Sequence, residues 1–129
     1  MQRDYAEYAQ AFERCDIDAA DFRHIDHIGV AHALLLRYGY LDASVIFCKC
    51  IDQIATEAGA AQKFNTTITL AFLSLIAERM ESSPDNSFED FIVEHPDLLS
   101  PDILARRYSP ERLASDSART MFLLPDLAA

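Results

Sequence analysis

The chain has 129 residues, of which 50% are apolar and 25% are charged, as in an ordinary globular protein. Its formal net charge of −10 argues against nucleic acid and anionic membrane surfaces as partners, because both repel an acidic protein. No run of apolar residues reaches the roughly 18 that a membrane span requires. The length favours a single domain over residues 1–129, and the presence of only 3 glycines favours long helices over many tight hairpins.

The three cysteines, Cys15, Cys48 and Cys50, are an odd number, which is typical of a protein kept in a reducing compartment. The first residues contain no apolar signal segment, so we expect a cytoplasmic protein. Cys48 and Cys50 are two apart in a helical pattern and point about 160° away from each other, which excludes a shared metal ion or an unstrained disulfide between them. We interpret both as small core residues.

In chain order, the first predicted helix covers residues 3–15, where aromatic residues recur at helical spacing. Residues 16–21 form a connection. Asp18 or Asp21 is expected to cap the next helix, because a short acidic side chain can accept a hydrogen bond from the first free backbone amides. Gly39 is expected to end that helix.

This second helix carries three of the four histidines, His24, His27 and His32, within nine residues. At about 100° per residue, all three fall on the apolar arc, whereas Asp26 and Val30 fall on the opposite, solvent-facing arc. A buried imidazole needs a hydrogen-bond partner for each ring nitrogen or stays neutral, and the neutral form is also the one that binds metals. The helix therefore predicts a cluster of polar groups inside the core.

Two further long helices are predicted, over residues 41–58, ending at Gly59, and over residues 64–80. The second is apolar in almost all directions, so we expect it to be the central helix, surrounded by the others. Its polar residues Asn65 and Thr69 are four apart and share a side. Asn65 could alternatively cap the helix, and the Thr69 hydroxyl could bond to the backbone one turn earlier.

The last third of the chain predicts short elements. They are a helix over 88–94 capped by Ser87, a helix over 102–108, a segment opened by Ser-Pro at 109–110 that continues to about residue 121, and an extended strap over the core at 122–126. The sequence contains no phosphate-binding glycine loop, no nucleophile elbow and no zinc-type cysteine pair. The predicted fold is an all-α single compact bundle of five to seven helices.

Three segments resemble a group of small, uncharacterised bacterial helical proteins. They are Phe22-Arg23-His24-Ile25-Asp26-His27, residues 63–69, and residues 108–113 with the following Ala118-Arg119 and Pro125-Asp126. The group has F-x-H-x-D-H and Y-H-x-T-x-T motifs, and the resemblance implies a fold and a site but no reaction. Here Phe64 stands in place of the tyrosine and Asn65 in place of the histidine. If that histidine completes a three-histidine metal site, this chain lacks one ligand.

The leading hypothesis is a buried pocket lined by His24, His27, Asn65 and Thr69, with His32 as a further candidate. Such a pocket would bind a small polar or anionic ligand, or a divalent metal through His24 and His27. In an enzyme, His24 or His27 would be the acid or base.

The alternative hypothesis is a non-catalytic homo-oligomeric or protein-interaction module, in which the histidines are core residues with satisfied hydrogen bonds. The apolar segment 121–124 would then suit the interface of a homodimer. Nucleic-acid binding is not expected, because basic and aromatic residues are not interleaved.

Overall fold

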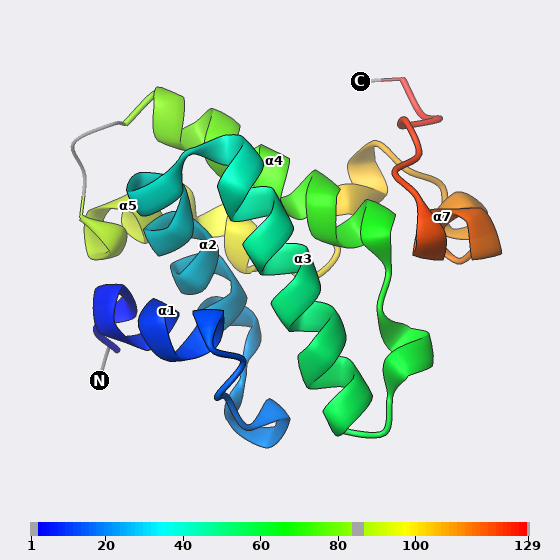
Figure 1. Cartoon of the computed structure of the whole chain (residues 1–129). Coiled ribbons are helices and arrows are strands. Elements are labelled where there is room, and N and C mark those ends of the chain that lie inside the picture. Colours follow the sequence, from blue (N-terminus) through cyan, green and yellow to red (C-terminus); the bar gives the residue numbers. More distant parts are fainter. Residues whose placement is uncertain (1–2, 84–86, 129) are drawn as a thin grey trace.

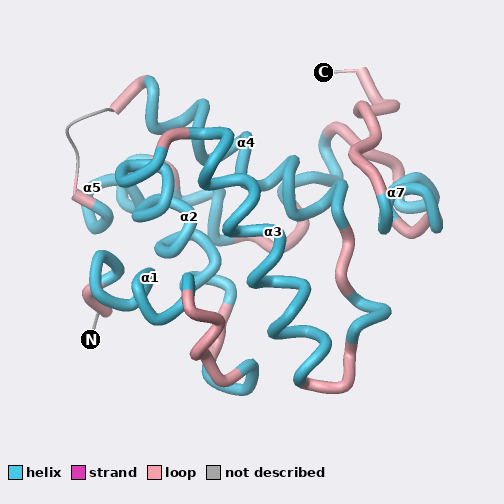
Figure 2. Tube along the Cα trace, in the orientation of Figure 1, coloured by secondary structure: helices cyan, strands magenta, loops and turns pink. Residues whose placement is uncertain are grey.

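The computed structural model describes residues 3–83 and 87–128, and Figure 1 shows their arrangement. Over these residues the chain forms seven α-helices and four short 3-10 helices, with no strand (Figure 2). The prediction of an all-α fold with five to seven helices is confirmed. No helix of the described residues is long and apolar enough to cross a membrane.

The helices follow the predicted segments closely in the first two thirds of the chain. In order they are α1 (Tyr5–Glu13), η1 (Ala19–Asp21), α2 (His24–Tyr38), α3 (Tyr40–Glu57), η2 (Ala61–Lys63), α4 (Thr66–Glu81), α5 (Phe88–Glu94), η3 (Pro96–Leu99), η4 (Ile103–Arg106), α6 (Pro110–Leu113) and α7 (Asp116–Thr120). Gly39 ends α2 as predicted. Its φ of 82° is open to glycine, and this one residue separates α2 from α3.

Two predictions, the cap of α2 and a helix over residues 102–108, are wrong. Neither Asp18 nor Asp21 caps α2, because the N-cap residue of α2 is Arg23, and Asp18 instead caps η1 by accepting from the Ala20 amide. The segment 102–108 contains only the 3-10 helix η4. Residues 110–121 divide into α6 and α7, because the hydroxyl of Ser115 accepts a hydrogen bond from the Ala118 amide and starts a new helix.

Helix α2, which contacts α1, α3 and α4, has the largest share of buried residues of the three long helices. Its buried residues lie on both of its arcs and include Ile28, Val30 and Leu34, each with no exposed surface. The predicted central helix, α4, is less enclosed, and Ile68 on it is 40% exposed. The burial of α2 was not predicted from the sequence pattern, because α1 covers the arc of α2 that was expected to face solvent.

Gly29 allows this close approach of α1 to α2. A Cβ at Gly29 would lie 2.5 Å from ring carbons of Tyr5 on α1, which is well inside van der Waals contact. The absence of a side chain therefore lets the Tyr5 ring rest directly on the backbone of α2.

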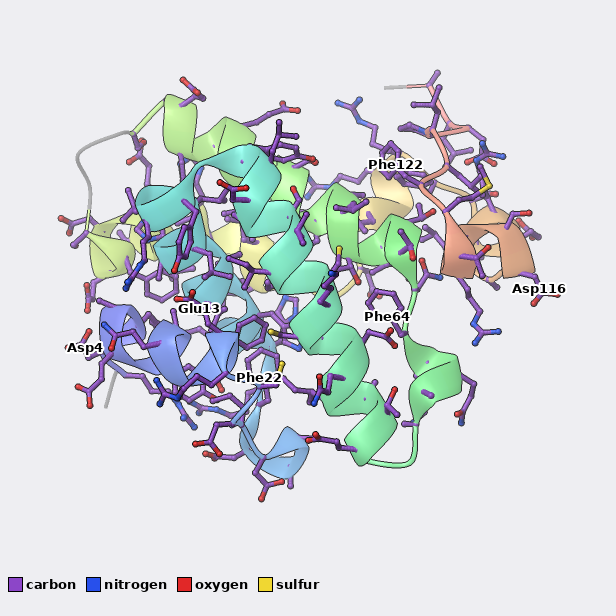
Figure 3. The ribbon with its side chains drawn as sticks, viewed as in Figure 1. Asp4, Glu13, Phe22, Phe64, Asp116 and Phe122 are labelled. Atoms are coloured by element: carbon purple, nitrogen blue, oxygen red, sulfur yellow. The ribbon has the colours of Figure 1, made fainter. Side chains whose placement is uncertain are left out.

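The C-terminal strap, residues 121–126, is extended as predicted and lies with α7 at the end of the molecule opposite α1 (Figure 1). The buried Thr67 hydroxyl near the start of α4 donates to the Met121 carbonyl oxygen at 2.7 Å and accepts from the Leu123 amide at 3.0 Å. The strap does not cover the main core, since Phe122, labelled in Figure 3, and Leu124 remain exposed.

Candidate functional site

His24 occupies the first turn of α2, where its ring lies against Phe72 of α4 with the ring centroids 5.4 Å apart. Its Nε2 is 3.0 Å from the carbonyl oxygen of Leu98. A carbonyl oxygen only accepts hydrogen bonds, so Nε2 carries the proton in the neutral ring. Nδ1 is then a hydrogen-bond acceptor.

His27 lies one turn further along α2, with its ring centroid 6.4 Å from that of His24. Its ring packs on Phe22, labelled in Figure 3, at a centroid distance of 4.3 Å. Burial, with a smaller contribution from His24, lowers the pKa of His27 to about 4, so the imidazole is neutral near pH 7. Among the described residues its ring nitrogens have no hydrogen-bond partner.

The two imidazoles line a cavity of about 290 Å³ between α2, α3, α4 and η4. Most of the remaining wall is apolar: Phe47, Ile51 and Ala55 from α3, Ile68 and Phe72 from α4, Ile103 and Leu104 from η4, and Phe64 and Pro101 from the connections. Asn65, Thr69 and the exposed Lys63 supply the other polar groups. The structure thus brings together four of the five predicted site residues: His24, His27, Asn65 and Thr69.

Both ends of the Asn65 amide are bonded to the fold. Its Oδ1 accepts from the Ile68 amide at 2.9 Å, which caps α4, and its Nδ2 donates to the Leu113 carbonyl oxygen at 2.7 Å. Thr69 donates its hydroxyl to the Asn65 carbonyl oxygen at 2.7 Å, so its oxygen can only accept from a ligand. The alternatives considered for both residues, a helix cap and a backbone bond one turn earlier, are therefore what the structure shows.

His32 lies apart from this cavity. It follows His27 by five residues, which turns it about 140° round the helix. Its ring contacts Phe88 and Phe91 of α5, at centroid distances of 5.6 and 5.0 Å, and lines a different cavity of about 640 Å³. Burial lowers the pKa of His32 as well.

A metal centre finds little support in this geometry. The described residues contain no group of three His, Cys, Asp or Glu side chains that could hold a metal ion. His24 already has Nε2 on a carbonyl oxygen, and the amide of Asn65 is occupied at both ends. The residues at the cavity therefore offer hydrogen bonds rather than a completed coordination shell.

Asp26, which lies between the two cavity histidines in sequence, is a polar residue whose predicted position is wrong. It was expected on the solvent-facing arc, yet it has no exposed surface. Its carboxylate accepts from the Tyr5 hydroxyl at 2.7 Å and from the Arg23 amide at 2.9 Å, and the Arg3 guanidinium lies 3.2 Å away. These bonds fix the first turn of α2 and hence the directions in which His24 and His27 point.

The protonation of Asp26 follows from these contacts. Burial by itself raises the pKa of the carboxyl group, but the hydrogen bonds from the Arg23 backbone and Tyr5, with the charges of Arg3 and Arg23, outweigh it and hold the pKa below its ordinary value. One signal in the sequence could have pointed to this network: a cation and a tyrosine, Arg3 and Tyr5, lie together at the start of the first helix.

Comparison with protein-family models, curated proteins and solved structures finds no match. The resemblance carried by the histidine and Asn65 motifs therefore stays a prediction.

Proposed function

We propose that the protein is a binding module for a small organic molecule that has an apolar body and one hydrogen-bonding group. The ligand would occupy the cavity between α2, α3, α4 and η4. A concave, largely apolar wall with a few convergent polar groups is the usual character of a small-molecule site, and about 290 Å³ is at the lower end of the volumes such sites have.

The observation that carries this proposal is the state of His27. The ring is half-buried and has no hydrogen-bond partner among the described residues, and its nitrogens are not among the fully enclosed unpaired atoms, so they are open to the cavity, where a ligand can replace the water that bonds them. Because its pKa is lowered to about 4, His27 is neutral and offers one donor and one acceptor to a ligand.

The surrounding groups support one orientation of the ligand. Its polar group would meet His27, with Nδ1 of His24 and the Thr69 oxygen as further acceptors. Its apolar body would lie against the aromatic and aliphatic wall formed by α3 and η4. Lys63 at the same cavity would favour an anionic over a cationic ligand.

A direct test titrates 4-methylphenol, a ring with one hydroxyl group, into the protein and follows the amide signals by NMR. We expect shifts confined to the cavity wall and a Kd on the order of 1 mM, as for other very small ligands. His27→Phe keeps a ring but removes both nitrogens, and should weaken binding by about fivefold, the effect of one hydrogen bond. His32→Phe, in the other cavity, is the matched control and should leave the Kd unchanged.

Two further probes sharpen the result. 4-Methylbenzoate should bind more tightly than 4-methylphenol if Lys63 contributes. Zinc should cause no saturable shifts at His24 and His27. Saturable zinc binding that His27→Phe abolishes, or phenol binding that His27→Phe leaves unchanged, would contradict the proposal.

A second candidate function, self-association into a homodimer, is favoured by the C-terminal strap. Met121, Phe122 and Leu124 are 53%, 41% and 69% exposed, although Thr67 and Tyr108 hold the strap backbone in place by hydrogen bonds. Such a fixed apolar surface suits a symmetric contact. Light scattering over a range of concentrations tests it: a dimer that Phe122→Ser converts to a monomer supports it, and a monomer throughout excludes it.

A further inference from the structure

Cys15 and Cys50 meet in the structure although 35 residues separate them in the chain. Cys15 lies two residues after the end of α1 and has a φ of 55°, an uncommon value outside glycine. Cys50 lies on the face of α3 that packs into the core and is 4% exposed. Their Sγ atoms are 3.0 Å apart.

The two thiols form a short hydrogen-bonded chain. Cys15 donates to the sulfur of Cys50, and Cys50 donates to the carbonyl oxygen of Glu13 at 3.7 Å. Glu13, the last residue of α1, is labelled in Figure 3. Cys15 is only partly buried, so a small reagent can reach one thiol of the pair from solvent.

The third cysteine provides an internal contrast. Cys48 is also on α3, but two residues before Cys50, so it points to a different face of the helix. Among the described residues, no cysteine lies within bonding distance of Cys48. Only one of the three pairs of cysteines is therefore placed for a disulfide.

We propose that Cys15 and Cys50 are a thiol–disulfide modification site, oxidised by a low-molecular-weight disulfide of the glutathione class. The thiolate of Cys15 attacks one sulfur of the reagent, which forms a mixed disulfide and releases the first reduced thiol. Cys50 then attacks Sγ of Cys15 and releases the second. Two protein thiols are oxidised to one disulfide while the reagent disulfide is reduced to two thiols, each of which takes up one proton.

The second step is expected to be slow near neutral pH. Burial raises the pKa of Cys50 to about 12, so its reactive thiolate is scarce. The site then responds to prolonged oxidising conditions rather than to brief exposure, and its rate should rise with pH.

The disulfide would join the end of α1 to the middle of α3. The neighbouring residues Phe12 and Phe47 already pack there, with ring centroids 5.9 Å apart, and Phe47 also lines the cavity of the proposed binding site. Oxidation would thus tie the N-terminal helix to one wall of that cavity. The modification itself does not depend on the proposed ligand.

The sequence makes the test direct. Trypsin cleaves after Arg14, Arg23, Arg37, Lys49 and Lys63, so each cysteine falls in its own peptide. The folded protein is incubated with oxidised glutathione, unreacted thiols are blocked, and the digest is analysed by mass spectrometry without reduction. We expect peptide 15–23 to be linked to peptide 50–63, with peptide 38–49 carrying the blocking group.

Variants decide the remaining questions. Cys48→Ser should form the same link, whereas Cys15→Ser and Cys50→Ser should not. Oxidised wild-type protein should melt roughly 5–15 °C higher than reduced protein, and a reductant should remove the gain. Far-UV circular dichroism confirms that each variant is folded. Persistent blocking of both Cys15 and Cys50 in folded wild-type protein, or a link that involves Cys48, would overturn the proposal.

Discussion

The first turn of α2 has two polar sides that differ sharply. On the α1 side, the Asp26 carboxylate is fully buried, yet it has Tyr5, the Arg23 amide and Arg3 within 3.2 Å. On the side towards α3 and α4, His27 is less buried but has no hydrogen-bond partner among the described residues and faces a cavity.

This difference separates a structural role from a candidate functional one. Buried polar groups that have all their hydrogen-bond partners stabilise the fold, because the loss of any partner raises the free energy of the folded state. An imidazole that has no partner in the fold but is open to a cavity can exchange its bonds to water for bonds to a ligand, which is why His27 is the candidate functional group. Four experiments can break or sharpen this distinction.

The largest effect is expected for Asp26→Asn. Removal of the charge leaves Arg3 without its buried partner and disturbs the bonds from Tyr5 and Arg23, which should lower the free energy of unfolding by about 3–5 kcal/mol. Chemical denaturation measures this. Asp21→Asn, which removes the exposed partner of Arg3, is the control and should cost at most about 1 kcal/mol. Equal losses of stability in the two variants would mean that the buried bonds of Asp26 contribute no more than the exposed ion pair of Asp21.

The next effect contrasts the packing on the two sides. Gly29→Ala places a methyl group against the Tyr5 ring and should cost about 2 kcal/mol. Ala55→Leu adds a larger group on the cavity side, where there is room, and should change the stability by less than about 1 kcal/mol while it weakens binding of 4-methylphenol. A costly Ala55→Leu would show that the cavity is smaller in solution.

The pH dependence tests the unpaired state of His27. Above about pH 7.5 the ring is neutral in both the folded and unfolded chains. As the pH falls through 6.5, the unfolded chain takes up a proton that the folded chain resists until about pH 4, so stability is lost over this range. Between about pH 7.5 and 5 the loss should be about 2 kcal/mol, and His27→Phe should lack it. If the stability of His27→Phe and of the wild type changed with pH in the same way, the His27 ring would be exposed to solvent in the folded protein.

The smallest effect is expected for Asn65, which lies at the cavity but, like Asp26, is hydrogen-bonded to other parts of the fold. Asn65→Ser keeps a cap for α4 but loses the bond to Leu113, and should cost about 1 kcal/mol. The Kd for 4-methylphenol should stay within about twofold, since both the oxygen and the nitrogen of the Asn65 amide are already bonded to the fold. A larger loss of binding would make Asn65 a ligand-contacting residue.

The sequence allowed the fold to be predicted where local signals sufficed. Apolar spacing indicated α1 to α5, and Gly39 marked the boundary of α2 and α3. The burial of Asp26 could not be predicted, because it depends on α1 crossing the polar arc of α2 at Gly29. Likewise, the sequence pattern placed His24 and His27 on the inward-facing side of the helix. Only the fold shows that the Leu98 carbonyl oxygen bonds to His24 and not to His27.

Thr67 has one more consequence. Its buried hydroxyl accepts a hydrogen bond from the Leu123 amide and donates one to the Met121 carbonyl oxygen. The C-terminal residues are therefore bonded to the first turn of α4. Slow hydrogen exchange at the Leu123 amide would report the docking of the whole C-terminal third. A variant truncated after Thr120 would leave the Thr67 hydroxyl without these two partners. This variant should unfold at a lower temperature than the full chain, although it keeps every long helix.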